Sequence, residues 1–125
     1  GVGADLSVHE GPVSLSRAAR PVALAEGMIL SNEPGYYLPG SYGVRLENLL
    51  LVQQAALPAA TKPFLRFETL TLAPFDRRLI AVGMLTADER RWLDDYHARV
   101  LAEVGPHLPA ATQDWLARCC ARLAR

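Results

Sequence analysis

The sequence of 125 residues predicts an α+β fold, with antiparallel strands first and a pair of helices after them. Residues 28–33 and 42–52 are two apolar runs, and the segment between them is rich in proline and glycine. Residues 64–72 alternate apolar and polar side chains, whereas the residues after Thr86 repeat apolar side chains at helical spacing. Strands followed by helices, rather than strands alternating with helices, indicate the α+β class.

The amino-acid composition argues against two classes of partner, nucleic acids and membranes. Half of the residues are apolar, so the chain can bury a core, and 13 basic residues balance 13 acidic ones. This balance lacks the basic surface of a protein that binds nucleic acid or anionic membranes. No apolar run approaches the roughly 20 residues that span a bilayer. We therefore expect no nucleic-acid or membrane partner and a cytoplasmic location, where Cys119 and Cys120 would be reduced thiols.

The two apolar runs predict a hairpin. Residues 34–41 supply the turn residues and suggest a long loop between the strands. The second run is apolar on both faces towards its end, which would put Glu47 in or beside a core. An unpaired buried carboxylate costs several kcal/mol, so Glu47 should be paired, hydrogen-bonded or bound to a metal. Arg45 is the nearest candidate partner for an ion pair.

The second half of the chain predicts one strand and two helices. Residues 64–72 form the strand, and Thr86 with Glu89 fits a capping box that starts the first helix. Gly105 and the following proline end that helix, and a second helix runs from about residue 109 to 123. Both helices carry a tryptophan and neighbouring leucines, which is more apolar surface than a short helix pair buries in itself. We expect this surface to serve association with a partner.

Glu33 and Glu47 are the acidic residues set in strongly apolar strand contexts. Two carboxylates suit hard divalent ions such as Mn²⁺ or Mg²⁺, and Zn²⁺ or Co²⁺ are also compatible. An alternative without metal is an ion pair of Arg45 with Glu47 on one strand face, with Glu33 capping a turn. His9 could transfer protons beside such a site, or it could be a hydrogen-bonded structural residue. The residue pattern alone leaves both explanations open.

Three short motifs carry a resemblance to a known family: VHEGP at residues 8–12, EPGYY at 33–37 and VRLEN at 44–48. Together they resemble the C-terminal part of the catalytic domain of pita-bread metallopeptidases, and among these the Xaa-Pro aminopeptidases. Residues 64–80 and the helix pair resemble the C-terminal extension of the same subfamily. The resemblance covers essentially the whole chain. It implies a domain boundary between residues 1–60, from the pita-bread domain, and residues 61–125, the extension.

The resemblance also implies roles for individual residues. Glu33 and Glu47 match two glutamate ligands of a centre of two divalent ions, with Mn²⁺ favoured and Glu47 at the bridging position. His9 matches a histidine that stabilises the substrate or its tetrahedral intermediate. Tyr37 matches a tyrosine near the attacking water, and Arg45 an arginine that pairs with a ligand carboxylate. The implied reaction is hydrolysis of the peptide bond between an N-terminal residue and a following proline.

The centre of that family also uses two aspartates and a histidine, which would lie before Gly1. We therefore expect the chain to be a fragment that is inactive alone and needs the N-terminal part of the same enzyme as a partner. Two alternatives remain for the function. One is a non-catalytic pita-bread module that binds peptides or proteins, and the other is a relative of prolidase or methionine aminopeptidase.

Overall fold

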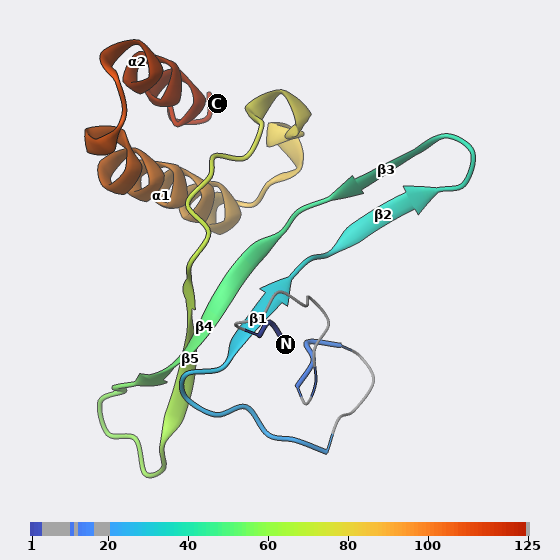
Figure 1. The fold of residues 1–125 in the computed structure, drawn as a ribbon, viewed down its shortest axis with the longest axis vertical. Helices are drawn as coiled ribbons and strands as arrows, with labels where there is room; N and C mark the ends of the chain where they lie inside the picture. Colours follow the sequence, from blue (N-terminus) through green and yellow to red (C-terminus); the bar gives the residue numbers. More distant parts are fainter. Residues whose placement is uncertain (4–10, 12, 17–20, 125) are drawn as a thin grey trace. The chain divides into compact units, whose positions relative to one another are not determined.

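The structure is a computed structural model, and it describes most of the chain: residues 1–3, 11, 13–16 and 21–124. It divides into two compact units, residues 1–71 and residues 72–125. Within the described residues, the strands belong to the first unit and the helices to the second (Figure 1).

A three-stranded antiparallel sheet forms the base of the first unit. Its strands lie in the order β1 (Ile29–Asn32), β4 (Asn48–Ala55) and β5 (Phe64–Thr69). Leu30 and Val52 are almost completely buried on this sheet and pack with the buried Val13. The strand predicted over residues 64–72 is confirmed, and it ends three residues earlier than expected.

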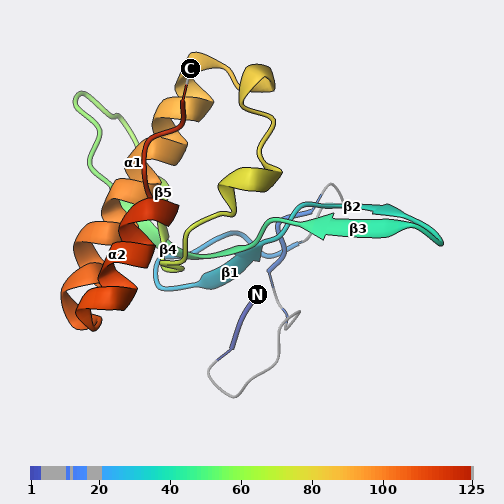
Figure 2. The same cartoon turned by 90° about the horizontal axis from the view of Figure 1, so that it is seen from above.

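The hairpin continues beyond β1 and β4 as a two-stranded arm, which Figure 2 shows extending past β1. Its strands are β2 (Gly35–Leu38) and β3 (Tyr42–Arg45), and every residue in both is exposed. The turn spans only residues 39–41, where Gly40 has a φ of +74° that favours glycine. The prediction of a long loop is therefore wrong, because residues 35–38 after Pro34 form a strand that pairs with residues 42–45.

A short break separates the arm from the base sheet. Residues 33–34 and 46–47 belong to no strand, although the Leu46 N–H donates to the Pro34 carbonyl at 3.1 Å. Proline has no N–H to give to a strand ladder, so regular pairing stops at Pro34. The run over residues 42–52, expected as one strand, is divided into β3 and β4 for this reason.

The second unit confirms the predicted helix pair, α1 (Ala87–Val104) and α2 (Ala110–Cys119). Thr86 and Glu89 form the expected capping box at the start of α1. The core between the helices contains a small set of buried side chains: Leu93, Tyr96, Val100, Leu116, Cys120 and Leu123.

The second helix ends earlier than expected, at Cys119 rather than near Leu123. The Arg77 guanidinium donates to the carbonyls of Arg118 and Arg122 at 3.2 and 2.8 Å, which satisfies backbone groups at this end of the helix. Both cysteines are free thiols, and burial raises the pKa of the Cys120 thiol. In the part of the chain that the structure describes, no helix is long and apolar enough to cross a membrane.

Candidate metal centre

The break in the hairpin brings Glu33 and Glu47 to facing positions. The pairing joins Asn32 to Asn48 on one side of the break and Gly35 to Arg45 on the other. The same register, continued through the break, sets Glu33 opposite Glu47. Residues directly opposite in an antiparallel pair keep their Cβ atoms about 4.5–5.5 Å apart, close enough for two carboxylates to share a cation.

Among the described residues, Ser31 and Arg45 contact the Glu33 carboxylate. The Ser31 hydroxyl donates to Glu33 Oε1 at 2.7 Å, and Arg45 Nη1 lies 3.1 Å from Glu33 Oε2. The Glu33 side chain is 20% exposed, so water screens these contacts less than it would on an open surface. Sequence reasoning missed Ser31, although its position two residues before Glu33 in a strand puts both side chains on one face.

Arg45 pairs with Glu33, not with the expected partner Glu47. Gly35 lies opposite Arg45 and has no side chain, so the guanidinium can reach diagonally across the hairpin to Glu33. Tyr37, through its hydrogen bond and its charge, raises the pKa of Arg45, and the two glutamates raise it further. The guanidinium is therefore a fixed positive charge beside both carboxylates.

Glu47 is exposed, which corrects the prediction that it lies in or beside a core. Burial in this run begins one residue later at Asn48, which is 8% exposed; residues 49–51 are half-buried and Val52 is buried. Within these 125 residues the arm also carries its apolar side chains exposed. The cost of burying a charge thus gives no argument for a ligand at Glu47, and the case rests on its position opposite Glu33.

Tyr37 lies across two glycines of the arm. A Cβ atom at Gly35 would lie 2.5 Å from the Tyr37 hydroxyl oxygen, and one at Gly43 would lie 2.6 Å from Tyr37 Cδ1. The hydroxyl accepts a hydrogen bond from Arg45 Nε at 2.8 Å. The glycines therefore give the ring a flat surface from which its hydroxyl reaches the guanidinium.

His9, the other predicted site residue, lies outside the described residues. Among the residues that the structure describes, no group of three or more His, Cys, Asp and Glu side chains could hold a metal ion. The carboxylates of Glu33 and Glu47 are oxygen donors of the kind that hard divalent cations prefer, but two of them do not complete a coordination shell. The donor set fits part of a metal centre.

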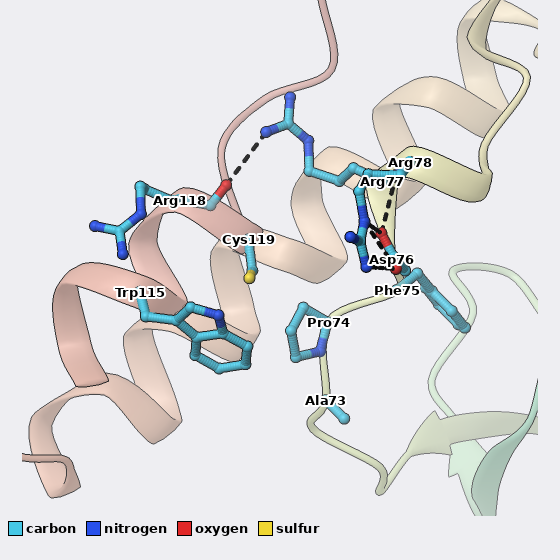
Figure 3. Close-up of a pocket in the computed structure, with 9 residues that line it drawn as sticks. All are labelled: Ala73, Pro74, Phe75, Asp76, Arg77, Arg78, Trp115, Arg118 and Cys119. Carbon is cyan, nitrogen blue, oxygen red and sulfur yellow. Dashed lines mark hydrogen bonds and ion pairs between the residues drawn. The ribbon is translucent and has the colours of Figure 1, made fainter. Parts of the chain in front are cut away.

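The second unit has a separate pocket of about 630 Å³ beside Trp115 and Cys119 (Figure 3). Its charged side chains at Asp76, Arg77 and Arg78 have partners within the unit. The Arg78 guanidinium binds the Asp76 carboxylate, which lowers the pKa of Asp76 to about 2. The Arg77 guanidinium binds two backbone carbonyls. The positive charges of Arg77 and Arg78 are therefore already engaged and are less available to a ligand.

Two family models match the chain. Residues 1–54 match the model described as metallopeptidase family M24, and residues 63–123 match the C-terminal region of peptidase M24. A "Probable Xaa-Pro aminopeptidase P" of Arthroderma gypseum is 44% identical over 124 residues, which are 94% of this chain and 20% of that protein. "Aminopeptidase P2" of Arabidopsis thaliana is 47% identical over 122 residues, 93% of this chain and 17% of that protein.

Comparison with solved structures shows the same fold. The X-prolyl aminopeptidase of Caenorhabditis elegans, described as a cytosolic enzyme with a di-nuclear active site, superposes with a TM-score of 0.88. It is 37% identical, and the match covers 98% of this chain and 21% of that one. The expected fold is thus confirmed, and the chain spans about a fifth of the length of the relatives it matches.

Proposed function

Since this chain belongs to the M24 metallopeptidase family, we propose that it is the C-terminal part of an Xaa-Pro aminopeptidase. The enzyme would hydrolyse the bond between an N-terminal residue and a following proline. The names of the similar proteins support this substrate class. The observation that carries the proposal is the placement of Glu33 and Glu47 on facing segments of one hairpin, with Arg45 fixed beside them.

Glu33 and Glu47 would contribute carboxylate ligands to two divalent ions, with Mn²⁺ favoured and Zn²⁺ or Co²⁺ compatible. The di-nuclear site described for the nematode enzyme supports the number of ions. When bound, such ions lower the pKa of water and stabilise negative charge that develops on a carbonyl oxygen. Arg45 would keep the Glu33 carboxylate in place, and Tyr37 would keep the guanidinium in place. His9 would stabilise charge on the substrate.

The remaining ligands would come from the N-terminal part of the same enzyme, so the 125 residues alone would be inactive. We keep the division into residues 1–60 and 61–125 as a proposal. The start of the C-terminal family match at residue 63 supports it, whereas β5 pairs with β4 in the first unit. We also propose a cytoplasmic location, which the description of the nematode enzyme as cytosolic supports.

A homodimer through the helix pair is a further part of the proposal. Trp92 and Trp115 are 54% and 51% exposed, and tryptophan is among the residues enriched at protein interfaces. Light scattering on the full-length protein tests this proposal. A measured mass equal to that of one chain at micromolar concentration would refute the homodimer.

The function is tested with the full-length protein and Mn²⁺. We expect release of the first residue from an Xaa-Pro-Xaa tripeptide, and no release from the matched Xaa-Ala-Xaa peptide. Cleavage of Xaa-Pro dipeptides alone would indicate a prolidase, and cleavage of Met-Ala-Xaa would indicate a methionine aminopeptidase. Binding of peptides without any cleavage would favour the non-catalytic module and overturn the proposal.

A further inference from the structure

We propose that Ser31 is a positioning residue, whose hydroxyl holds the Glu33 carboxylate in the orientation that binds metal. This inference rests on the proposed function, because it assumes that Glu33 is a ligand. It adds to that function a residue outside the three recognisable motifs.

The backbone of β1 sets the geometry. Side chains along a strand alternate between faces, so Ser31 shares a face with Glu33, while Leu30 points to the buried face. The Ser31 hydroxyl consequently reaches Glu33 Oε1 at 2.7 Å, a normal length for a strong hydrogen bond between a hydroxyl and a carboxylate.

The Glu33 carboxylate is held from two strands. Ser31 on β1 donates to Oε1, and Arg45 on β3 binds Oε2 at 3.1 Å. Rotation of the carboxylate plane would weaken both contacts, so its orientation is restricted. A carboxylate has about four acceptor positions, so these two contacts by themselves do not fill them. The two contacts therefore restrict the orientation of the carboxylate.

The contact is separable from the folding of β1. Ser31 pairs with Leu49 of β4 through the backbone, and that pairing does not use the hydroxyl. Removal of the hydroxyl should therefore release the carboxylate and leave the strand in place. Threonine and valine provide a matched test, because they have the same shape, both favour strands, and only threonine has a hydroxyl.

The experiment measures Co²⁺ binding to the full-length protein and its variants. Co²⁺ is the probe because its visible absorption reports the ligand geometry. We expect Ser31→Ala and Ser31→Val to bind Co²⁺ about 10–100-fold more weakly and to change the absorption spectrum, as loss of a partner behind a metal ligand does. Ser31→Thr should retain the affinity and the spectrum of the wild type. Ser41→Ala, in the exposed turn of the arm, is the control for loss of a hydroxyl elsewhere.

The outcomes separate this inference from the proposed function. If the wild type cleaves Xaa-Pro peptides and Ser31→Val binds Co²⁺ as tightly as Ser31→Thr, Ser31 has no positioning role and the function stands. If all three Ser31 variants lose Co²⁺ equally, the site needs serine for its size and the inference is overturned. A wild type that neither binds Co²⁺ nor cleaves these peptides overturns both.

Discussion

Glu33 and Glu47 occupy facing positions of one antiparallel hairpin, at the break where neither segment is regular strand. Pro34 stops the regular pairing there, and the common register on both sides of the break keeps the two segments aligned. The first carboxylate is held by Ser31 and Arg45, whereas the second is exposed. Contacts within the chain therefore orient the Glu33 carboxylate more than the Glu47 carboxylate.

Replacement of Glu47 by alanine in the full-length protein should remove metal and activity together. Metal ions contribute several kcal/mol to hydrolysis, so the rate should fall at least about 100-fold. Metal content by elemental analysis and release of the first residue from an Xaa-Pro peptide measure the two effects. Glu103→Ala on α1 is a matched control, because Glu103 pairs with Arg99 on the surface. A Glu47→Ala protein with full metal content would refute the ligand role.

Replacement of His9 by alanine should separate metal binding from turnover. A histidine that acts on the substrate is not a ligand, so the variant should keep its metal while kcat falls by about 100-fold or more. Elemental analysis and steady-state kinetics on the full-length protein give both values. The control is His107→Ala, an exposed histidine after α1, which should leave both unchanged. Loss of metal from the His9 variant would show that the histidine is a ligand.

Tyr37→Phe should lower activity, whereas Tyr36→Phe should not. The Tyr37 hydroxyl accepts from Arg45 Nε at 2.8 Å, while the Tyr36 ring lies 6.2 Å from that of Tyr42. Removal of the Tyr37 hydroxyl frees the guanidinium that holds Glu33, and the expected loss in kcat/KM is about 10–100-fold. The two variants carry the same chemical change at neighbouring positions of β2, so equal losses in both would contradict a specific role of Tyr37.

Gly43→Ala should disturb the same contact from the other strand. The added Cβ atom would lie 2.6 Å from Tyr37 Cδ1, so the ring must shift, which disturbs its contact with Arg45. We expect a loss of activity similar to that of Tyr37→Phe, and little further loss when both changes are combined, because they act on one contact. At Gly83 a Cβ atom would have no neighbour within 4 Å, so Gly83→Ala is the control. Fully additive losses would show that Gly43 acts independently of Tyr37.

The parts of the fold that sequence predicted correctly depend on local patterns. Thr86 and Glu89 are three residues apart and form a capping box through their own backbone, so no distant contact is needed to recognise it. The alternation over residues 64–72 gave β5 for the same reason. Such signals are complete within a few residues, so they do not depend on contacts with distant parts of the chain.

The parts that sequence missed depend on contacts across the hairpin. Gly35 resembles a turn residue, yet it lies in β2, where it pairs with Arg45 and the Tyr37 ring covers it. The partner of Arg45 could not be deduced from spacing, since Gly35 on the opposite strand decides where the guanidinium can reach. The proposed ligand positions come from a family resemblance, and the structure adds the register that aligns Glu33 with Glu47.

His97 should make the stability of the second unit depend on pH. The ring is fully buried on α1, and its Nε2 accepts a hydrogen bond from the Phe75 N–H at 3.1 Å. The neutral ring therefore carries its proton on Nδ1, and protonation of Nε2 would break that bond. Burial lowers the pKa of His97, the positive charge of Arg77 lowers it further, and Asp94 opposes the shift.

The direction of the pH effect follows from this lowered pKa. Between the lowered pKa and the ordinary value of about 6.5, the unfolded chain binds the proton and the folded one does not. The free energy of unfolding is therefore highest above that range and falls as the pH drops through it, by at most about 1.4 kcal/mol per pH unit. The Asp76 carboxylate, whose pKa is about 2, titrates well below this range.

Urea unfolding between pH 8 and pH 5, followed by tryptophan fluorescence, measures this dependence, because both tryptophans of the chain lie in the second unit. His97→Gln should flatten it, since an amide oxygen can accept from the Phe75 N–H without titrating. The exposed His107, changed to glutamine in the same way, should keep the wild-type slope. If His97→Gln keeps that slope as well, the hydrogen bond to Phe75 does not control the response, and another group must take up the proton on unfolding.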